Sequence, residues 1–239
     1  MDSDTFGSRY LSFIYNTGIP SPLPDQTDIL DPYDGDEVRR VVSLFYSKYY
    51  SDNNRRIFLI GINPGRIGCG VTGINFTDAA ALQEDCGISS TLPTTRELSA
   101  RFIYEMIRHC GGTDLFFSRF FLTALSPLGF THNGKNRNYY DTPDLMNALR
   151  PWLIETFSRQ IELGADRRIA FSLGQGKNYK ILQELNTAHG FFEEIRPLPH
   201  PRWVMQYRSR EKESFLDLYK ETLEAACHPA EYDTKREDS

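Results

Sequence analysis

The sequence lacks the features that mark several large classes of protein. Its four cysteines (Cys69, Cys86, Cys110 and Cys227) include no pair at CxxC spacing, which disfavours zinc, although four thiols could in principle ligate an iron–sulfur cluster. No run approaches the roughly 18 uninterrupted apolar residues of a membrane helix. The first residues, MDSDTFGSRY, contain neither the basic nor the apolar region of a signal peptide. We therefore expect no metal and no membrane, and a location in the cytoplasm, or in the nucleus of a eukaryotic cell.

Several familiar catalytic motifs are also missing. There is no HExxH, no carboxylate pair stands out, and no Ser–His–Asp order is legible. The segment GCGVTG (68–73) matches GxGxxG, but Pro64 separates it from the preceding strand and no helical pattern follows it. The segment GQGK (174–177) lacks the spacing and the Ser/Thr of a phosphate-binding loop. Both segments also fit ordinary turns, so a nucleotide-dependent enzyme is only an alternative.

The composition is that of one globular domain. The chain has 239 residues, of which 40% are hydrophobic and 13% aromatic, so it can bury a large core. We expect a single domain over 1–239, a monomer, with a disordered polar tail at 229–239. The formal net charge is −5, yet five basic residues face one acidic residue between Arg196 and Lys212. This local excess fits either a nucleic-acid surface or a solvated helix face.

Strands alternate with helices along the chain. Apolar runs predict strands at 55–61, 115–125, 167–174 and 191–201, and periodic segments predict helices at 36–50, 94–112, 142–164, 176–190 and 209–226. Thr94 and Glu97 form a capping-box pattern, Thr142 is a candidate N-cap, and Pro151 should kink or divide its helix. The alternation predicts an α/β protein, a three-layer α/β/α sandwich with a central four-stranded parallel sheet.

In such sheets the functional site lies beyond the carboxyl ends of the strands. Asn63 follows the first predicted strand and His200 follows the fourth. After the first strand comes GINPGRIGCGVTGINF (61–76), in which six of sixteen residues are glycine or proline. Such a bare backbone suits a flat ligand that approaches it closely. Each residue also has an ordinary role, a turn for Asn63 and His200 and core packing for Phe76, but together they predict a site.

These motifs resemble the single-strand-selective monofunctional uracil-DNA glycosylase family, within the uracil-DNA glycosylase superfamily. The resemblance rests on GINPGRIGCGVTGINF, which corresponds to the family's GMNPG…TGVPF loop, on SARFIYEMIRHCGG, on SPL before GKNRNYYDTPDL, and on PHPR before a terminal helix. It extends from about residue 30 to about residue 226. It implies an α/β fold and a DNA glycosylase of base-excision repair that needs no cofactor and acts on DNA containing a damaged or deaminated base, single- or double-stranded.

The resemblance also implies roles for individual residues. Asn63 would position the attacking water, and His200 would donate to a carbonyl oxygen of the departing base. Phe76 would stack on the flipped base, Gly65 would leave space beside it, and the N–H of Ile62 would contribute a donor. No lysine stands in these loops as a Schiff-base former, so lyase activity is not expected.

Two departures from the family concern base choice and DNA contact. The family's uracil-reading asparagine corresponds to Ala124, with Ser126 as the nearest polar substitute, so we expect a preference that extends beyond uracil, to xanthine or hypoxanthine. A non-catalytic binder of damaged bases is the alternative. The segment after His200 is shorter than in the family, and its candidate DNA-contacting residues are Arg202, Trp203, Met205 and Arg208.

Overall fold

The computed structural model describes residues 4–227 and has a parallel sheet at its centre. The strands are β2 (Arg56–Gly61), β3 (Phe120–Ala124), β6 (Ala165–Leu173) and β7 (Glu194–Leu198), in the order β3-β2-β6-β7. All neighbouring pairs are parallel. The predicted fold class is therefore confirmed, and the predicted tail at 229–239 lies outside the described residues.

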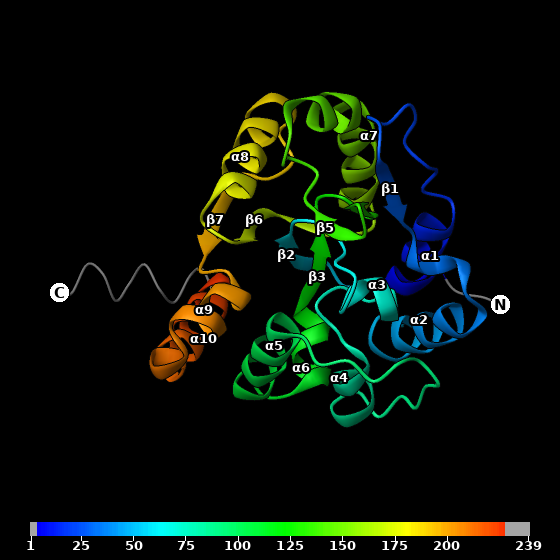
Figure 1. The fold of residues 1–239 in the computed structure, drawn as a ribbon. Helices are drawn as coiled ribbons and strands as arrows, with labels where there is room; N and C mark the ends of the chain where they lie inside the picture. The colour runs from blue at the N-terminus through cyan, green and yellow to red at the C-terminus, as the bar shows by residue number, and fades with distance from the viewer. Residues whose placement is uncertain (1–3, 228–239) are drawn as a thin grey trace.

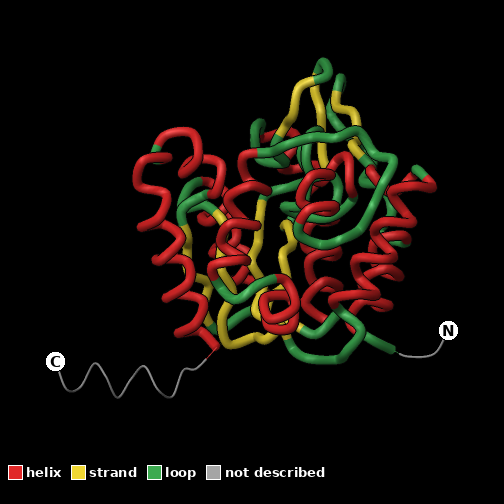
Figure 2. Tube along the Cα trace, turned by 90° about the horizontal axis from the view of Figure 1, so that it is seen from below, coloured by secondary structure: helices red, strands yellow, loops and turns green. Residues whose placement is uncertain are grey.

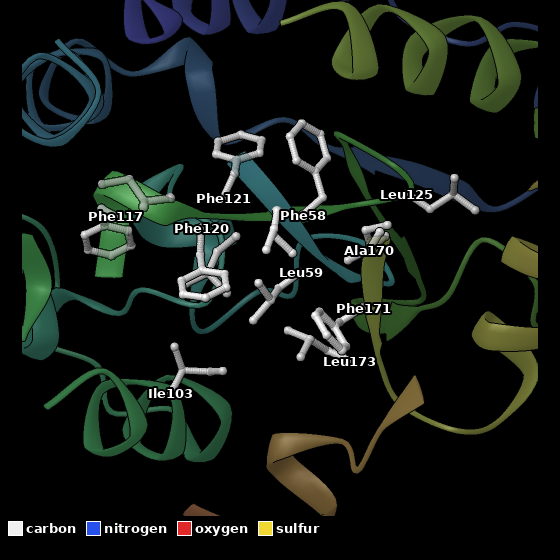
Figure 3. Close-up of a cluster of buried hydrophobic side chains, with 14 of the residues drawn as sticks. Phe58, Leu59, Ile103, Phe117, Phe120, Phe121, Leu125, Ala170, Phe171 and Leu173 are labelled. Carbon is white, nitrogen blue, oxygen red and sulfur yellow. The ribbon is translucent and has the colours of Figure 1, made fainter. Parts of the chain in front are cut away.

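Helices cover both faces of this sheet (Figure 1). One layer contains α1 (Phe6–Tyr15), α2 (Asp36–Tyr49), α7 (Pro143–Glu162) and α8 (Lys177–His189), and the other contains α5 (Leu98–His109) and α10 (Lys212–Cys227). Successive strand residues alternate between the layers, as Figure 3 shows for Phe58 and Leu59, with Leu59 on the side of Ile103 of α5. Every residue of β2 is buried, which explains its continuous apolar sequence.

A second, smaller sheet was not predicted. It is antiparallel, in the order β1-β4-β5, from β1 (Thr27–Leu30), β4 (Gly129–His132) and β5 (Lys135–Arg137). The β4–β5 hairpin projects beyond the helices at one end of the molecule (Figure 2). These strands have three or four residues each and carry many polar side chains, so their periodicity is too weak to read.

Two expectations about helical segments were wrong, and of the two outcomes expected at Pro151, a kink or a division, the division does not occur. The 94–112 helix begins only at Leu98, because the backbone N–H of Glu97 donates to Asp78 Oδ2 (2.6 Å) and no side chain caps the helix. The 115–125 run begins as a helix, α6 (Thr113–Arg119), before it enters β3. Pro151 does not divide α7, since Leu149 and Leu153 on either side of it are fully buried and hold both parts in place.

The remaining elements are short. They are α3 (Cys69–Thr72) and α4 (Ala79–Glu84) after β2, α9 (Pro201–Tyr207) after β7, and 3-10 turns at Pro32–Asp34 and Ser209–Glu211. The helix α3 lies inside the glycine-rich loop, and α9 begins directly after His200. Both elements therefore stand at the carboxyl ends of the central strands, the end of the sheet at which a site was predicted.

Candidate active site

A cavity of about 280 Å³ opens at the carboxyl ends of β2 and β3. We call it the loop cavity, because the glycine-rich loop supplies most of its wall. Its lining includes Asn63 and Phe76 from this loop, Ala124 from the end of β3 and His200 from the start of α9. Other lining residues are Gly61, Ile62, Pro64, Gly65, Cys69, Asn75, Glu97, Ser99, Asn136, Asn138 and Arg202. Its volume is near the lower end of the range for small-molecule pockets, which suits a ligand no larger than one base.

The side chain of Asn63 is held in one orientation by three hydrogen bonds. Its Nδ2 donates to the carbonyl oxygens of Pro64 (3.1 Å) and Arg137 (3.3 Å), and its Oδ1 accepts from the backbone N–H of Tyr139 (3.1 Å). Both amide hydrogens are used, whereas Oδ1 keeps a second lone pair. Asn63 can therefore still accept one hydrogen bond, from a water or a ligand.

Two of these partners come from the end of β5 and the residues just after it. Arg137 ends β5, and its guanidinium donates to the hydroxyls of Thr27 (2.7 Å) in β1 and Thr142 (2.7 Å) at the N-cap of α7. Tyr139 is fully buried, and its hydroxyl donates to Asn178 Oδ1 (2.7 Å), while Asn178 donates back to the carbonyl of Gly61 (3.3 Å). The orientation of Asn63 thus depends on contacts far from it in the sequence.

Phe76 packs against Gly61, the last residue of β2. Its backbone has a positive φ of 56°, and its half-buried ring lies so close to Gly61 that a Cβ there would be 2.7 Å from Phe76 Cζ. Glycine at position 61 is thus required for this ring position. Gly70 and Gly129 likewise allow the chain to approach the carbonyls of Gly65 and Pro64. The high glycine content of the loop is therefore explained by close backbone packing as well as by the cavity.

The contact of His200 with α9 fixes the tautomer of its ring. Its Nδ1 accepts from the backbone N–H of Arg202 (3.1 Å) and caps α9, so the proton of the neutral ring is on Nε2. Burial lowers the pKa of the imidazole to about 4, and the positive charge of Arg202 lowers it further. The ring can therefore donate from Nε2 at neutral pH without carrying a charge.

A second cavity, of about 320 Å³, adjoins the first. We call it the α8 cavity, because Gly176, Lys177 and Asn178 at the start of α8 line it. It shares Ile62 and His200 with the loop cavity, and the loops after β6 and β7 complete it. All four strand-end loops therefore meet at one edge of the sheet, although they border two cavities.

The surface of α9 presents aromatic and basic side chains beside both cavities. Trp203 is 41% exposed, and Tyr207, one helical turn later, is 69% exposed. Arg208 lies over the Trp203 ring (5.6 Å to its centroid) and also pairs with Glu211 (3.4 Å). Met205 is half-buried against the hydrophobic core, so the structure does not support it as a DNA-inserting residue.

Ser126 does not reach the loop cavity, so the structure contradicts it as a base-contacting residue. It is fully buried, and its hydroxyl donates to the carbonyl of Leu128 (2.7 Å). Ala124, by contrast, lines the cavity and offers only a methyl group.

Sequence reasoning missed several lining residues, chiefly Asn75, Glu97 and Asn138. Burial raises the pKa of the Glu97 carboxyl. Asn75 stands next to Phe76 in the glycine-rich loop, and Asn138 is in the GKNRNYY segment. Because both segments had already been matched to the family, their polar residues could have been named as candidates from the sequence. Tyr207 was also missed, although its spacing from Trp203 is the signal of a shared helix face.

The described residues, 4–227, contain no group of three or more His, Cys, Asp or Glu side chains that could hold a metal ion. All four cysteines are free thiols. Within the same residues, no helix is both long and apolar enough to span a bilayer.

Comparisons with known proteins agree with this arrangement. A model of the uracil DNA glycosylase superfamily matches residues 47–224. The crystal structure of wild-type SMUG2 from Pedobacter heparinus is 38% identical in sequence, covers 93% of this chain and 98% of its own, and has a TM-score of 0.90. A search of curated proteins gave no match.

The chain therefore belongs to the uracil-DNA glycosylase superfamily, and within it to the SMUG-like family. It is a DNA glycosylase, a hydrolase that acts on N-glycosyl bonds in DNA repair.

Proposed function

We propose that this glycosylase turns a deaminated base out of DNA into the loop cavity and hydrolyses the bond between the base and deoxyribose C1′. Uracil is the first substrate, and xanthine and hypoxanthine are further ones. The observation that carries the proposal is that Phe76, Asn63 and His200 all line one cavity of about 280 Å³. A stacking surface, a fixed acceptor and a neutral donor are the groups that this hydrolysis requires.

The chemistry follows from the state of each group. With the base stacked on Phe76, the C1′–N bond breaks and its electron pair stays on the base, while the sugar becomes cation-like. His200 Nε2–H donates to a base carbonyl as negative charge collects there. Water adds to C1′, held by the free lone pair of Asn63 Oδ1, and releases a proton that ultimately neutralises the base anion. Asn63 is a poor base, so the reaction depends on an acidic leaving group.

The proposal that several bases are substrates rests on Ala124 in the cavity wall. Ala124 is 2% exposed and ends at a methyl group, so it offers no hydrogen bond to a base. A small wall residue leaves more room for a two-ring base than an amide would. In deaminated purines, as in uracil, the electron pair left on the nitrogen that was bonded to C1′ is delocalised over the ring, so these bases also leave as stabilised anions. Exposed Arg202 and the α9 surface would bind the flanking DNA.

The test is excision by the Asn63→Ala variant from oligonucleotides carrying uracil, xanthine or hypoxanthine, in single and double strands. Alkali-labile strand breaks report excision. We expect the wild type to excise and the Asn63→Ala variant to be slower by about 10²–10⁴-fold. Asn147→Ala, the same substitution on the exposed surface of α7, is the matched control and should retain full activity. Binding without excision by the wild type would favour a lesion binder, and full activity of Asn63→Ala would remove the water-holding role.

A further inference from the structure

Asn75 is a buried amide in the loop cavity that the catalytic scheme does not use. It is 6% exposed and lines the cavity beside Phe76. Among the described residues, no hydrogen bond joins its side chain to another residue, in contrast to Asn63 with its three partners. A buried amide without a partner is unfavourable by about 1–3 kcal/mol for each unsatisfied group.

The Asn75 amide faces open space within the protein. Within residues 4–227, the fully enclosed side-chain N and O atoms that have no partner belong only to Tyr49, Thr95 and Trp152. The amide atoms of Asn75 have no partner either, and yet they are not enclosed. Since the residue is almost completely buried, the space that these atoms reach is the loop cavity.

The backbone around Asn75 is fixed while its side chain is free. The Thr77 hydroxyl donates to the Asn75 carbonyl (3.3 Å) and lies 2.9 Å from the hydroxyl of Tyr104. One turn earlier, the Thr72 hydroxyl donates to the Thr77 carbonyl (2.6 Å) and accepts from Ile74 N–H (3.2 Å). The loop thus presents a firmly placed Cα, with an amide that can still rotate to match a ligand.

We propose, on the basis of the proposed function, that Asn75 is the residue that reads the flipped base, in place of the amide missing at Ala124. The two positions line the same cavity. The resembled family has proline at the position of Asn75, so this chain lacks one amide and gains another. The amide donor and acceptor fit a six-membered ring that presents a C=O next to an N–H, as uracil, xanthine and hypoxanthine do.

The test compares Asn75→Ala with wild type on two bases in single-stranded oligonucleotides under single-turnover conditions. Uracil presents the pair C4=O and N3–H, whereas 2-pyrimidinone keeps C2=O and lacks both C4=O and N3–H. We expect Asn75→Ala to excise uracil about 10–100-fold more slowly than wild type, and the two proteins to act equally on 2-pyrimidinone. Binding to DNA with a stable abasic site, which has no base to read, should be unchanged, as should the unfolding midpoint.

The possible outcomes distinguish a failure of the role of Asn75 from a failure of the proposed function. Equal uracil excision by Asn75→Ala and wild type overturns the inference and leaves the proposed function standing. An equal loss on both bases, or weaker abasic-site binding, identifies a structural role for Asn75 and also overturns it. A wild-type protein that excises no base overturns the proposed function, and the reading role with it.

Discussion

The role assigned to His200 can be isolated by two substitutions at the same position. Nδ1 caps α9 by accepting from Arg202 N–H, and Nε2–H is left to meet the base. Asparagine is a preferred N-cap and its oxygen can replace Nδ1, but it places no donor where Nε2 was. Alanine removes both functions. His200→Asn therefore tests the donor alone, and His200→Ala tests the donor together with the cap.

The expected magnitudes differ for chemistry and for stability. Removing one donor aimed at a developing oxyanion raises the barrier by about 2.7–4 kcal/mol, a rate loss of about 10²–10³. Loss of an N-cap to alanine lowers the free energy of unfolding by about 1 kcal/mol. Both variants should therefore lose about 10²–10³ in rate, whereas only His200→Ala should also lose stability.

The assay is single-turnover excision of uracil at saturating enzyme, with urea denaturation of the same proteins. 5-Fluorouracil leaves as a more stable anion than uracil and so depends less on a hydrogen-bond donor. The difference in excision rate between His200→Asn and wild type should therefore be smaller for 5-fluorouracil. A His200→Asn variant within about threefold of wild type on uracil would refute the donor role. So would a rate loss that is the same for both leaving groups.

Two more changes test the electrostatics and the shape of the cavity. Because the pKa of His200 is about 4, against an ordinary 6.5, the pH profile of the excision rate should show no inflection near pH 6.5. An inflection near pH 6.5 in the wild type that is absent from His200→Asn would contradict this. The unfolded state protonates first, so as pH falls from about 6.5 to about 4 the wild type should lose stability relative to His200→Asn, as measured by urea denaturation. A Cβ on Gly65 would meet only Asn136 Nδ2, at 3.4 Å, so Gly65→Tyr should fold, with a change in unfolding free energy within about 0.5 kcal/mol, and lose uracil excision by filling the cavity. Retained uracil excision by folded Gly65→Tyr would show that the base does not enter beside position 65.

The middle of the central sheet was predictable because β2 and β3 are buried on both faces, whereas the edge strand β7 alternates exposed and buried residues. A short, continuous apolar run such as IFLI in β2 is typical of a strand covered on both sides, and parallel topology then places Asn63 and His200 at one edge. The sequence misled where aromatic residues occur in a short helix, as Phe116 and Phe117 do in α6. Their strand propensity is real, but packing of the helix decided the outcome.

The small sheet and the cavity walls were not predictable from local patterns. Strands of three or four mostly polar residues carry no readable periodicity. Whether a serine faces a cavity or a carbonyl, as Ser126 does, depends on the path of the chain two residues later. The same holds for Asn75, whose spare hydrogen-bonding capacity is visible only after every other amide in the cavity has been matched with its partners.

The three polar side chains of the loop cavity to which a task is assigned differ in how firmly they are held, and this difference accords with their proposed tasks. The amide of Asn63 has three partners, two of them supplied by the segment after the hairpin turn, and the ring of His200 is held in one tautomer by its own helix. Groups that act on C1′ and on a base carbonyl meet the same atoms in every substrate, so a fixed position serves all of them. Asn75 meets the part of the base that varies, and a side chain with no internal partner can adapt to one ring or two. Fixed catalytic side chains, Asn63 and His200, together with a base-contacting side chain that can adapt, Asn75, would let this cavity accept several bases without a loss of catalytic geometry.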